Sequence, residues 1–386
     1  MSDSQFPTAL RMGRRGVLAA GLAAFASPAF GKDDLDAFFA DEMAGAGIPG
    51  LAVGLARKGT VRLARGYGFA DLADRRPVTG DTMFHIASIT KTVTAAAVMR
   101  LADQGRLALD APVAPHLDFP LVNPHHRDAP VTFRHLLTHV SSISDAKYYG
   151  VDFRVSGVDA NLALGDLLKD YLAPGGRIYS SEGCFSKAAP GAAWDYSNVG
   201  YGLLGYLAGR IGGQDMREQT REAIFAPLGM RHTSWTIAGT PEALRATPYD
   251  LVDGALGPVA PVGFPDWPVG MIRCSISDLM RFVAASANGG VARGTRIVSE
   301  QGMAQMLDMK TPPGLPDWLT GQGLGWMESK LGDGVKANHW GGDPGVFTAA
   351  YLDPASRSGV AILTNMTASA ESKAAVKRIA ARLLTA

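Results

Sequence analysis

The chain has 386 residues, of which 47% are apolar and 19% charged, the composition of a folded globular protein and not of a disordered one. Lys and Arg number 37 and Asp and Glu 36, a net charge of +1 at pH 7 with no long run of one sign, so nucleic-acid binding is not expected. The two cysteines, Cys184 and Cys274, exclude a disulfide framework and a four-thiolate zinc site and leave a single disulfide open.

Residues 1–31 have the pattern of an export signal. Arg14 and Arg15 precede a charge-free apolar stretch of about 15 residues, shorter than the roughly 20 that a membrane-spanning helix needs. The adjacent arginines resemble the twin-arginine signal of bacterial export. We therefore expect export to the periplasm by the twin-arginine machinery, cleavage after Ala29 or Gly31, and no stable membrane anchor.

Elements at the two ends of the remaining chain predict an antiparallel sheet. At each end, two short apolar runs are separated by a turn, such as Lys58-Gly59, and hairpins of this kind pair their strands antiparallel. A helix precedes the first hairpin and another follows the last, so the two can cover one face of the sheet. The predicted elements are a helix over 34–46, strands over 51–56 and 61–68, strands over 346–352 and 360–365, and a helix over 369–384.

Between these ends, helical patterns alternate with long loops rich in Gly and Pro. We therefore expect an α+β fold, an antiparallel sheet flanked by N- and C-terminal helices, with a mostly helical second subdomain. The domain would cover residues 32–386, with the sheet subdomain at about 32–83 and 336–386 and the helical subdomain at about 84–335. The predicted helices of the second subdomain cover 92–101, 132–137, 162–171, 201–211 and 277–287.

A serine and a lysine three residues apart stand at the start of the first of these helices. Ser88 and Lys91 would share one helix face, which brings the Lys91 amine within reach of the Ser88 hydroxyl. The positive end of the helix would also favour negative charge at Ser88. A second such pair, Ser144 and Lys147, lies in a polar stretch with no apolar helix behind it, and we interpret it as loop.

Two further stretches carry groups that can act on a substrate. Tyr196 and Asn198 follow Pro190-Gly191 and precede an apolar helix, so we expect both on a rigid loop at a helix entrance. Residues 339–345, with the sequence HWGGDPG, stand just before a predicted core strand. The glycines there would let a substrate approach the backbone closely, as one wall of a cleft.

In this order and spacing, Ser88xxLys91, Tyr196xAsn198 and His339xGly341 resemble the three motifs of the serine β-lactamase and D-alanyl-D-alanine carboxypeptidase superfamily, most closely its class C-like branch. The resemblance covers essentially all of residues 33–386. Flanking segments that share it are Thr132 to His139 (TFRHLLTH), Pro190-Gly191, and Pro227 to Met230 (PLGM).

The resemblance implies a role for each motif residue. Ser88 would be the acylated nucleophile, and Lys91 would either lower the pKa of Tyr196 or act as the base itself. Tyr196 would protonate the leaving group and then activate water, while Asn198 would hold a substrate oxygen. The backbone N–H groups of Ser88 and Gly342 would form the oxyanion hole. No metal or organic cofactor is implied.

The third motif departs from that of β-lactamases, where its first position is usually lysine. His339 is only partly charged near neutral pH, which weakens recognition of a free carboxylate and is more typical of D-alanyl peptidases. Trp340 replaces a small residue, and the sequence from Trp340 to Gly342 resembles the esterase branch, although a tryptophan beside a strand can also be core packing. The implied substrate-binding residues are Asn198, His339, Trp340, Gly341 and Gly342.

Two alternatives remain open at this point. His135 and His139 are four apart on a predicted helix and could share a metal, but no HExxH glutamate or obvious third ligand accompanies them. A non-catalytic peptidoglycan-binding or sensor module on the same fold is the other alternative, against which the intact Ser88, Lys91 and Tyr196 argue.

The sequence thus predicts an exported, cofactor-independent serine hydrolase that acts through an acyl-enzyme. Its substrate would be a small ester, a D-amino-acid amide or peptide, or a β-lactam. We place the esterase or peptidase activity first and a true class C-like β-lactamase second, because of His339 and Trp340. Residues 146–189 have no clear role in the sequence and are candidates for shaping the acyl pocket.

Overall fold

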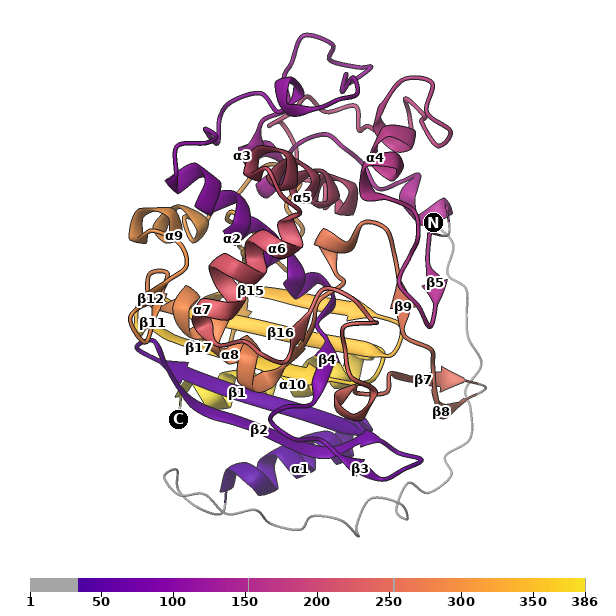
Figure 1. The fold of residues 1–386 in the computed structure, drawn as a ribbon. Coiled ribbons are helices and arrows are strands. Elements are labelled where there is room, and N and C mark those ends of the chain that lie inside the picture. The colour runs from indigo at the N-terminus through magenta and orange to yellow at the C-terminus, as the bar shows by residue number, and fades with distance from the viewer. Residues whose placement is uncertain (1–33, 152, 253, 386) are drawn as a thin grey trace.

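The computed structural model describes residues 34–151, 153–252 and 254–385, so the predicted export signal lies outside the described residues. An eight-stranded antiparallel sheet forms the base of the molecule in Figure 1, with most of the helices above it. Its strand order is β13-β14-β15-β16-β17-β1-β2-β3. The strands are β1 Gly50–Arg57, β2 Thr60–Asp71, β3 Arg76–Pro77, β13 Gly321–Gln322, β14 Met327–Leu331, β15 Gly334–Asp343, β16 Val346–Asp353 and β17 Ser358–Thr364.

Helices α1 (Asp34–Ala46) and α10 (Ala370–Thr385) cover one face of this sheet. The alternation of side chains along each strand explains the arrangement, because large apolar residues such as Leu51 and Val53 point toward these helices. Phe39 of α1 and Ile379 of α10 belong to the same buried cluster. The chain therefore closes its sheet with elements from both of its ends.

Helix α8 (Ile276–Ala287) packs on the opposite face, where the strands carry small residues. A Cβ on Gly54 would lie 2.2 Å from Cγ of Met280, so only glycine leaves room for the helix at this point. Ala52 and Ala56, on the same face of β1, belong to a second buried cluster that continues into the helical part. This cluster joins the sheet to the helices that carry the motifs.

The helical part is built around α2 and α5, which pack against each other. Its helices are α2 Thr90–Asp103, α3 Phe133–Leu137, α4 Leu164–Leu172, α5 Asn198–Gly212, α6 Met216–Thr220, α7 Ala226–Leu228 and α9 Glu300–Met306. Its short strands are β4 Met83–His85, β5 Val155–Ser156, β6 Thr233–Ser234, β7 Tyr249–Val252, β8 Ala255–Pro258, β9 Val262–Gly263, β10 Arg273–Ser275, β11 Val291–Ala292 and β12 Thr295–Arg296. Among the described residues no helix is long and apolar enough to cross a membrane.

The predicted α+β class, the antiparallel sheet and the terminal helices are confirmed. Residues 339–345 differ from the prediction, because most of them belong to β15 itself and do not form a loop ahead of the strand. Strands β13 and β14 were not predicted and extend the sheet beyond β15. Cys184 and Cys274 are both free and buried, so the single disulfide left open by the sequence is not formed.

Candidate active site

Ser88 lies in the short 3₁₀ turn η1 (Ala87–Ile89), which stands between β4 and α2 in the chain. Ala87, the residue before it, has φ of +45°, a conformation that costs an L-residue energy and is held only by its surroundings. The turn thereby presents Ser88 at the start of α2, as the sequence predicted. The Ser88 side chain is partly exposed, whereas its neighbours in the turn are buried.

Lys91 is fully buried in the first turn of α2, at 0% exposure. Its Nζ donates hydrogen bonds to Oγ of Ser88 at 3.1 Å and to the backbone oxygen of Val269 at 2.9 Å. Burial lowers the pKa of Lys91 from 10.5 to about 7, and the charges of nearby aspartates oppose this shift only in part. The amine is therefore neutral in about half of the molecules at neutral pH and can accept a proton from Ser88.

The Tyr196 ring lies against Lys91 and His139. The Nζ atom of Lys91 is 5.0 Å from the centre of the ring, and the imidazole of His139 stacks on it at 4.3 Å. Burial raises the pKa of Tyr196 above 10, and a hydrogen bond with Ser88 opposes that rise without cancelling it. The net effect of these surroundings is a raised pKa, so Tyr196 keeps its proton at neutral pH.

The buried carboxylate of Asp145 holds the segment that carries Tyr196 and Asn198. It accepts hydrogen bonds from the backbone N–H of Asn198 at 2.6 Å, from that of Val199 at 3.1 Å and from the hydroxyl of Ser197 at 3.1 Å. Ser197 is the N-cap of α5, so Asn198 is the first residue of the helix and not part of the loop before it. Sequence reasoning missed Asp145, which lies within the second Ser-Lys pair that we interpreted as loop.

His339 lies on the face of β15 that points toward Lys91, at 1% exposure. Its Nδ1 is 2.8 Å from the backbone oxygen of Trp340, and because a carbonyl only accepts, Nδ1 carries the proton. Burial, and then the charge of Lys91, lower the pKa of His339 to about 3. The imidazole is therefore neutral at neutral pH, which corrects the expectation of a partly charged group, and it supplies no cation for a substrate carboxylate.

Trp340 points to the other face of the sheet, toward α10. Its Nε1 donates to the hydroxyl of Tyr351 at 2.8 Å, and Nζ of Lys377 lies 5.0 Å from the centre of its ring. It also stacks on Trp318, at 5.4 Å between ring centres. Because Ser88 lies on the opposite face, we leave Trp340 out of the substrate-binding residues proposed below and assign it to packing.

Gly341 and Gly342 allow a direct test of how β15 supports η1, the turn that carries Ser88. A Cβ on Gly341 would lie 2.3 Å from the backbone oxygen of Ile86 and 2.4 Å from Oγ1 of Thr348, whereas a Cβ on Gly342 meets nothing within 4 Å. Gly341→Ala should lower the free energy of unfolding by about 1–3 kcal/mol and also reduce turnover, since β15 must move away from the turn. Thermal unfolding of Gly342→Ala, the matched control, should match that of the unmodified protein, and equal losses in both variants would contradict this account.

The other sequence candidates have structural roles. His135 completes the capping of α3, accepting from the backbone N–H of Thr132 at Nδ1, and Nδ1 of His139 accepts from the backbone N–H of Ser197. In the ranges that the structure describes, no group of three or more His, Cys, Asp or Glu residues is placed to hold a metal ion. Ser144 lies in a loop, with Lys147 in the turn that follows.

The family profile described as Beta-lactamase matches residues 35–385. The chain belongs to the beta-lactamase family. It is thus a serine hydrolase of the beta-lactamase fold, as the three motifs indicated.

Proteins similar to this chain include an esterase, a penicillin-binding protein homologue and an amidase. Esterase EstB of Burkholderia gladioli is 29% identical over 381 residues, which cover 86% of this chain and 89% of EstB. The octameric penicillin-binding protein homologue from Pyrococcus abyssi has a TM-score of 0.73 at 27% identity, and the match covers 91% of this chain and 77% of the homologue's chain. The D-amino acid amidase from Ochrobactrum anthropi SV3 shares the fold, with a TM-score of 0.72 at 23% identity over 92% of this chain and 98% of the amidase.

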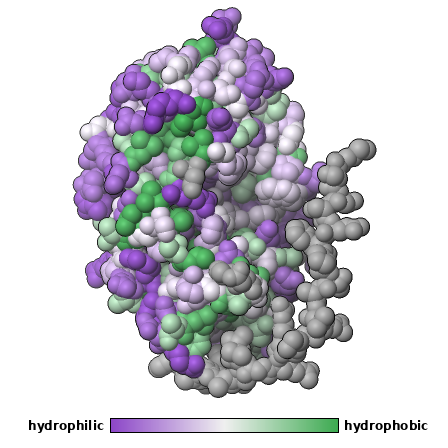
Figure 2. Space-filling view, turned by 90° about the vertical axis from the view of Figure 1, so that its right-hand side faces the viewer, coloured by the Kyte–Doolittle hydropathy of each residue, from purple (hydrophilic) through white to green (hydrophobic). Residues whose placement is uncertain are grey.

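In this beta-lactamase-family chain, residues 146–189 reach the site at two points. The hydroxyl of Tyr149 accepts a hydrogen bond from Nδ2 of Asn198 at 3.1 Å, and Arg154 forms an ion pair with Asp343 at 2.6 Å, one residue beyond Gly342. Tyr149 is also 72% exposed. Figure 2 shows the side of the molecule next to β5, β7 and β8, where hydrophobic patches lie among hydrophilic ones. Tyr149 and Arg154 thus lie at the edge of the candidate site.

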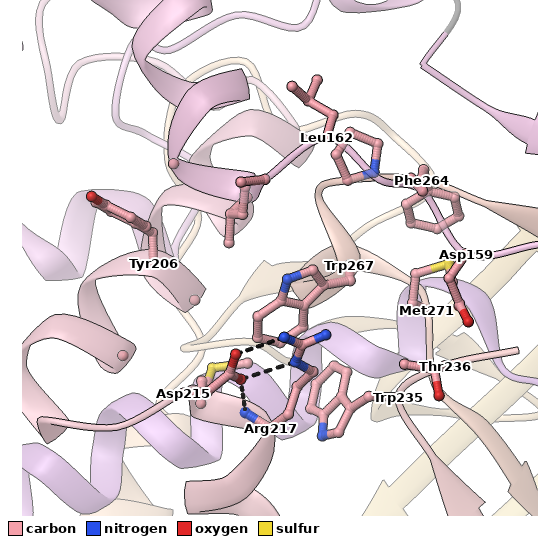
Figure 3. Close-up of a pocket in the computed structure, with 18 of the residues that line it drawn as sticks. Asp159, Leu162, Tyr206, Asp215, Arg217, Trp235, Thr236, Phe264, Trp267 and Met271 are labelled. Carbon is pink, nitrogen blue, oxygen red and sulfur yellow. Dashed lines mark hydrogen bonds and ion pairs between the residues drawn. The ribbon is translucent and has the colours of Figure 1, made fainter. Parts of the chain in front are cut away.

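A cavity of about 690 Å³ lies away from the catalytic motifs (Figure 3). None of the predicted site residues lines it. Trp235 and Trp267 form part of its wall, with the guanidinium of Arg217 over the Trp267 ring and paired with Asp215. Part of the cavity wall comes from the loop of residues 264–271, which also carries the backbone oxygen that binds Lys91.

Proposed function

We propose that this protein hydrolyses small, uncharged esters through an acyl-enzyme on Ser88, with D-amino-acid amides or peptides as related substrates. The observation that carries the proposal is the 3.1 Å hydrogen bond from Nζ of Lys91 to Oγ of Ser88, made by a lysine whose pKa lies near 7. A nucleophile and a base within hydrogen-bond reach are the minimum that acyl transfer requires.

The reaction would proceed in two halves with the protons balanced. The Lys91 amine takes the Ser88 proton while Oγ bonds to the substrate carbonyl, whose oxygen accepts from the N–H groups of Ser88 and Gly342. Tyr196 then protonates the leaving alkoxide or amine, and the C–O or C–N bond breaks. Lys91 returns its proton to Tyr196. In the second half the Lys91 amine takes a proton from water, which attacks the acyl carbon; the bond from that carbon to Oγ then breaks, and Lys91 returns the proton to Ser88.

The neutral His339 supports the preference for uncharged substrates. A β-lactam antibiotic carries a free carboxylate, and such a group is best held by a permanent cation. The imidazole of His339 is buried and neutral, so it offers hydrogen bonding without charge. The 29% identity to an esterase over 86% of the chain supports the same order of substrates, with β-lactam hydrolysis second.

We also propose that the chain is exported by the twin-arginine route and acts in the periplasm as the mature domain of residues 32–386, whose sheet subdomain also includes β13 and β14. Arg14 and Arg15 before an apolar stretch support this. Sequencing the N-terminus of the protein recovered from periplasm should give a start at residue 30 or 32. Recovery of the uncleaved chain from the cytoplasm alone would contradict export.

The test of the function compares two substrates with one adduct measurement. We expect turnover of a short-chain p-nitrophenyl ester, little turnover of a chromogenic cephalosporin, and an acyl adduct that peptide mapping places on Ser88. Ser88→Ala supplies the background rate. Fast cephalosporin hydrolysis would make the protein a β-lactamase instead. If esters and penicillin gave no turnover and no acyl adduct, that result would favour the non-catalytic binding module.

A further inference from the structure

The loop of residues 264–271 holds the catalytic lysine through its backbone. The oxygen of Val269 accepts from Nζ of Lys91 at 2.9 Å, and the oxygen of Pro268 accepts from Oγ1 of Thr94, one helical turn further along α2, at 2.7 Å. Within the loop, the N–H of Val269 donates to the backbone oxygen of Asp266 at 3.0 Å. The position of the Val269 oxygen therefore depends on where Asp266 is fixed.

The side chain of Asp266 is almost completely buried, at 1% exposure. Its Oδ2 accepts a hydrogen bond from the hydroxyl of Tyr148 at 2.8 Å, while Oδ1 has no partner in the described part of the chain. The Cβ of Asp266 packs against α5, where a Cβ added to Gly202 would lie 3.5 Å from it. A buried carboxylate with one unpartnered oxygen is costly, and tight packing alone does not require one.

The far side of the loop is not closed by packing, because it borders the cavity of about 690 Å³ in Figure 3. Trp267, between Asp266 and Pro268, forms part of that wall. The hydrogen bond from Tyr148 fixes the loop at Asp266, in addition to the contacts that its backbone oxygens make with α2. Tyr148 belongs to the 3₁₀ turn η3 (Tyr148–Gly150), whose next residue, Tyr149, contacts Asn198.

We propose that Asp266, held by Tyr148, is a positioning residue that fixes the Val269 oxygen against Lys91 and adds a buried negative charge to the surroundings of the Lys91 amine. The proposal deepens the function proposed above and rests on it, because it gives Lys91 the role of base. Neither residue touches the substrate or Ser88, so both act through Lys91.

The charges around Lys91 decide the direction of the effect. Burial raises the pKa of Asp266 to about 6, while Tyr148 and Lys91 favour its ionised form, so the carboxylate is charged above that pH. That charge stabilises the ammonium form of Lys91 and raises its pKa. Removing it makes the amine neutral at lower pH. The other groups facing Lys91 are the carboxylates of Asp145 and Asp343, the rings of Tyr196 and Tyr201, and the neutral imidazoles of His139 and His339.

The test measures the pKa of Lys91 directly, by NMR titration of protein carrying ¹³Cε-lysine, with the signal assigned from Lys91→Arg. Asp266→Asn should lower this pKa by about half a unit or more, and move the acidic limb of kcat/KM for a p-nitrophenyl ester to lower pH by the same amount. Tyr148→Phe should shift both in the same direction by less, because Asp266 loses a donor that favours its charge. Tyr149→Phe, the matched control on the same turn, should leave the pKa of Lys91 unchanged.

A purely structural role for Asp266 predicts a different result. In that case Asp266→Asn would lower kcat and stability while the Lys91 titration and the acidic limb stayed in place, and the proposal would be wrong. If Asp266→Asn does not fold, the Tyr148→Phe titration decides in the same way. The NMR titration needs no turnover, so failure of the esterase proposal, seen as turnover that survives in Ser88→Ala, is distinguishable from failure of this one.

Discussion

Replacing Lys91 with methionine should lower kcat/KM for a p-nitrophenyl ester by about 10³-fold or more. An ordinary lysine is neutral in only about 0.03% of molecules at pH 7, whereas burial lowers the pKa of Lys91 to about 7 and makes about half of the amines available as base. Methionine fills a similar volume without a basic nitrogen, so the loss measures proton transfer and not a cavity. Steady-state kinetics with active-site titration would give the value.

The pH dependence of the unmodified enzyme follows from the same group. Below pH 7 the ammonium form of Lys91 cannot accept a proton, so kcat/KM should fall tenfold per pH unit, and above pH 7 it should reach a plateau. Lys147→Met, in the second Ser-Lys pair, is the control and should retain full activity. An acidic limb that persists in Lys91→Met at the same pH would assign it to another group.

Some of the fold could be predicted from the sequence because its determinants are local. In the β1–β2 and β16–β17 hairpins a short turn joins the paired strands, so the turn residues and the alternation of large and small side chains lie in one stretch. Residues 339–345 were misassigned because their glycines and Pro344 resemble a turn. Only the pairing of β15 with β16 and β14 makes most of this stretch a strand.

The candidate site likewise combines residues that are close in the sequence with residues that only the fold brings together. Ser88 and Lys91 are three residues apart and could be paired from the helix period alone. Asp145 contacts Ser197 across 52 residues and Tyr148 contacts Asp266 across 118, so no spacing in the sequence relates them. Neither Asp145 nor Asp266 belongs to one of the three motifs. These long-range carboxylates oppose part of the effect of burial and so adjust the pKa of Lys91.

Tyr196→Phe should slow the hydrolysis of alkyl esters and amides by about 10²–10⁴-fold and that of p-nitrophenyl esters by much less. Burial raises the pKa of Tyr196, so the hydroxyl stays protonated and can donate to the leaving group. An alkoxide or amine anion needs that proton as its bond breaks, whereas p-nitrophenolate is a stable anion and leaves without it. Acylation rates for a series of esters with leaving groups of increasing basicity would measure the difference.

Tyr201 provides the control, since it is a neighbouring buried tyrosine whose hydroxyl donates to the backbone oxygen of Leu137 at 2.8 Å. Tyr201→Phe removes that bond, so it should reduce stability by about 1 kcal/mol and affect all leaving groups equally. If Tyr196→Phe also slowed aryl and alkyl esters by one common factor, its hydroxyl would not be the leaving-group acid. The protonated Lys91 would then be the candidate acid, because the neutral His339 carries its proton on Nδ1, which is hydrogen-bonded to the backbone oxygen of Trp340.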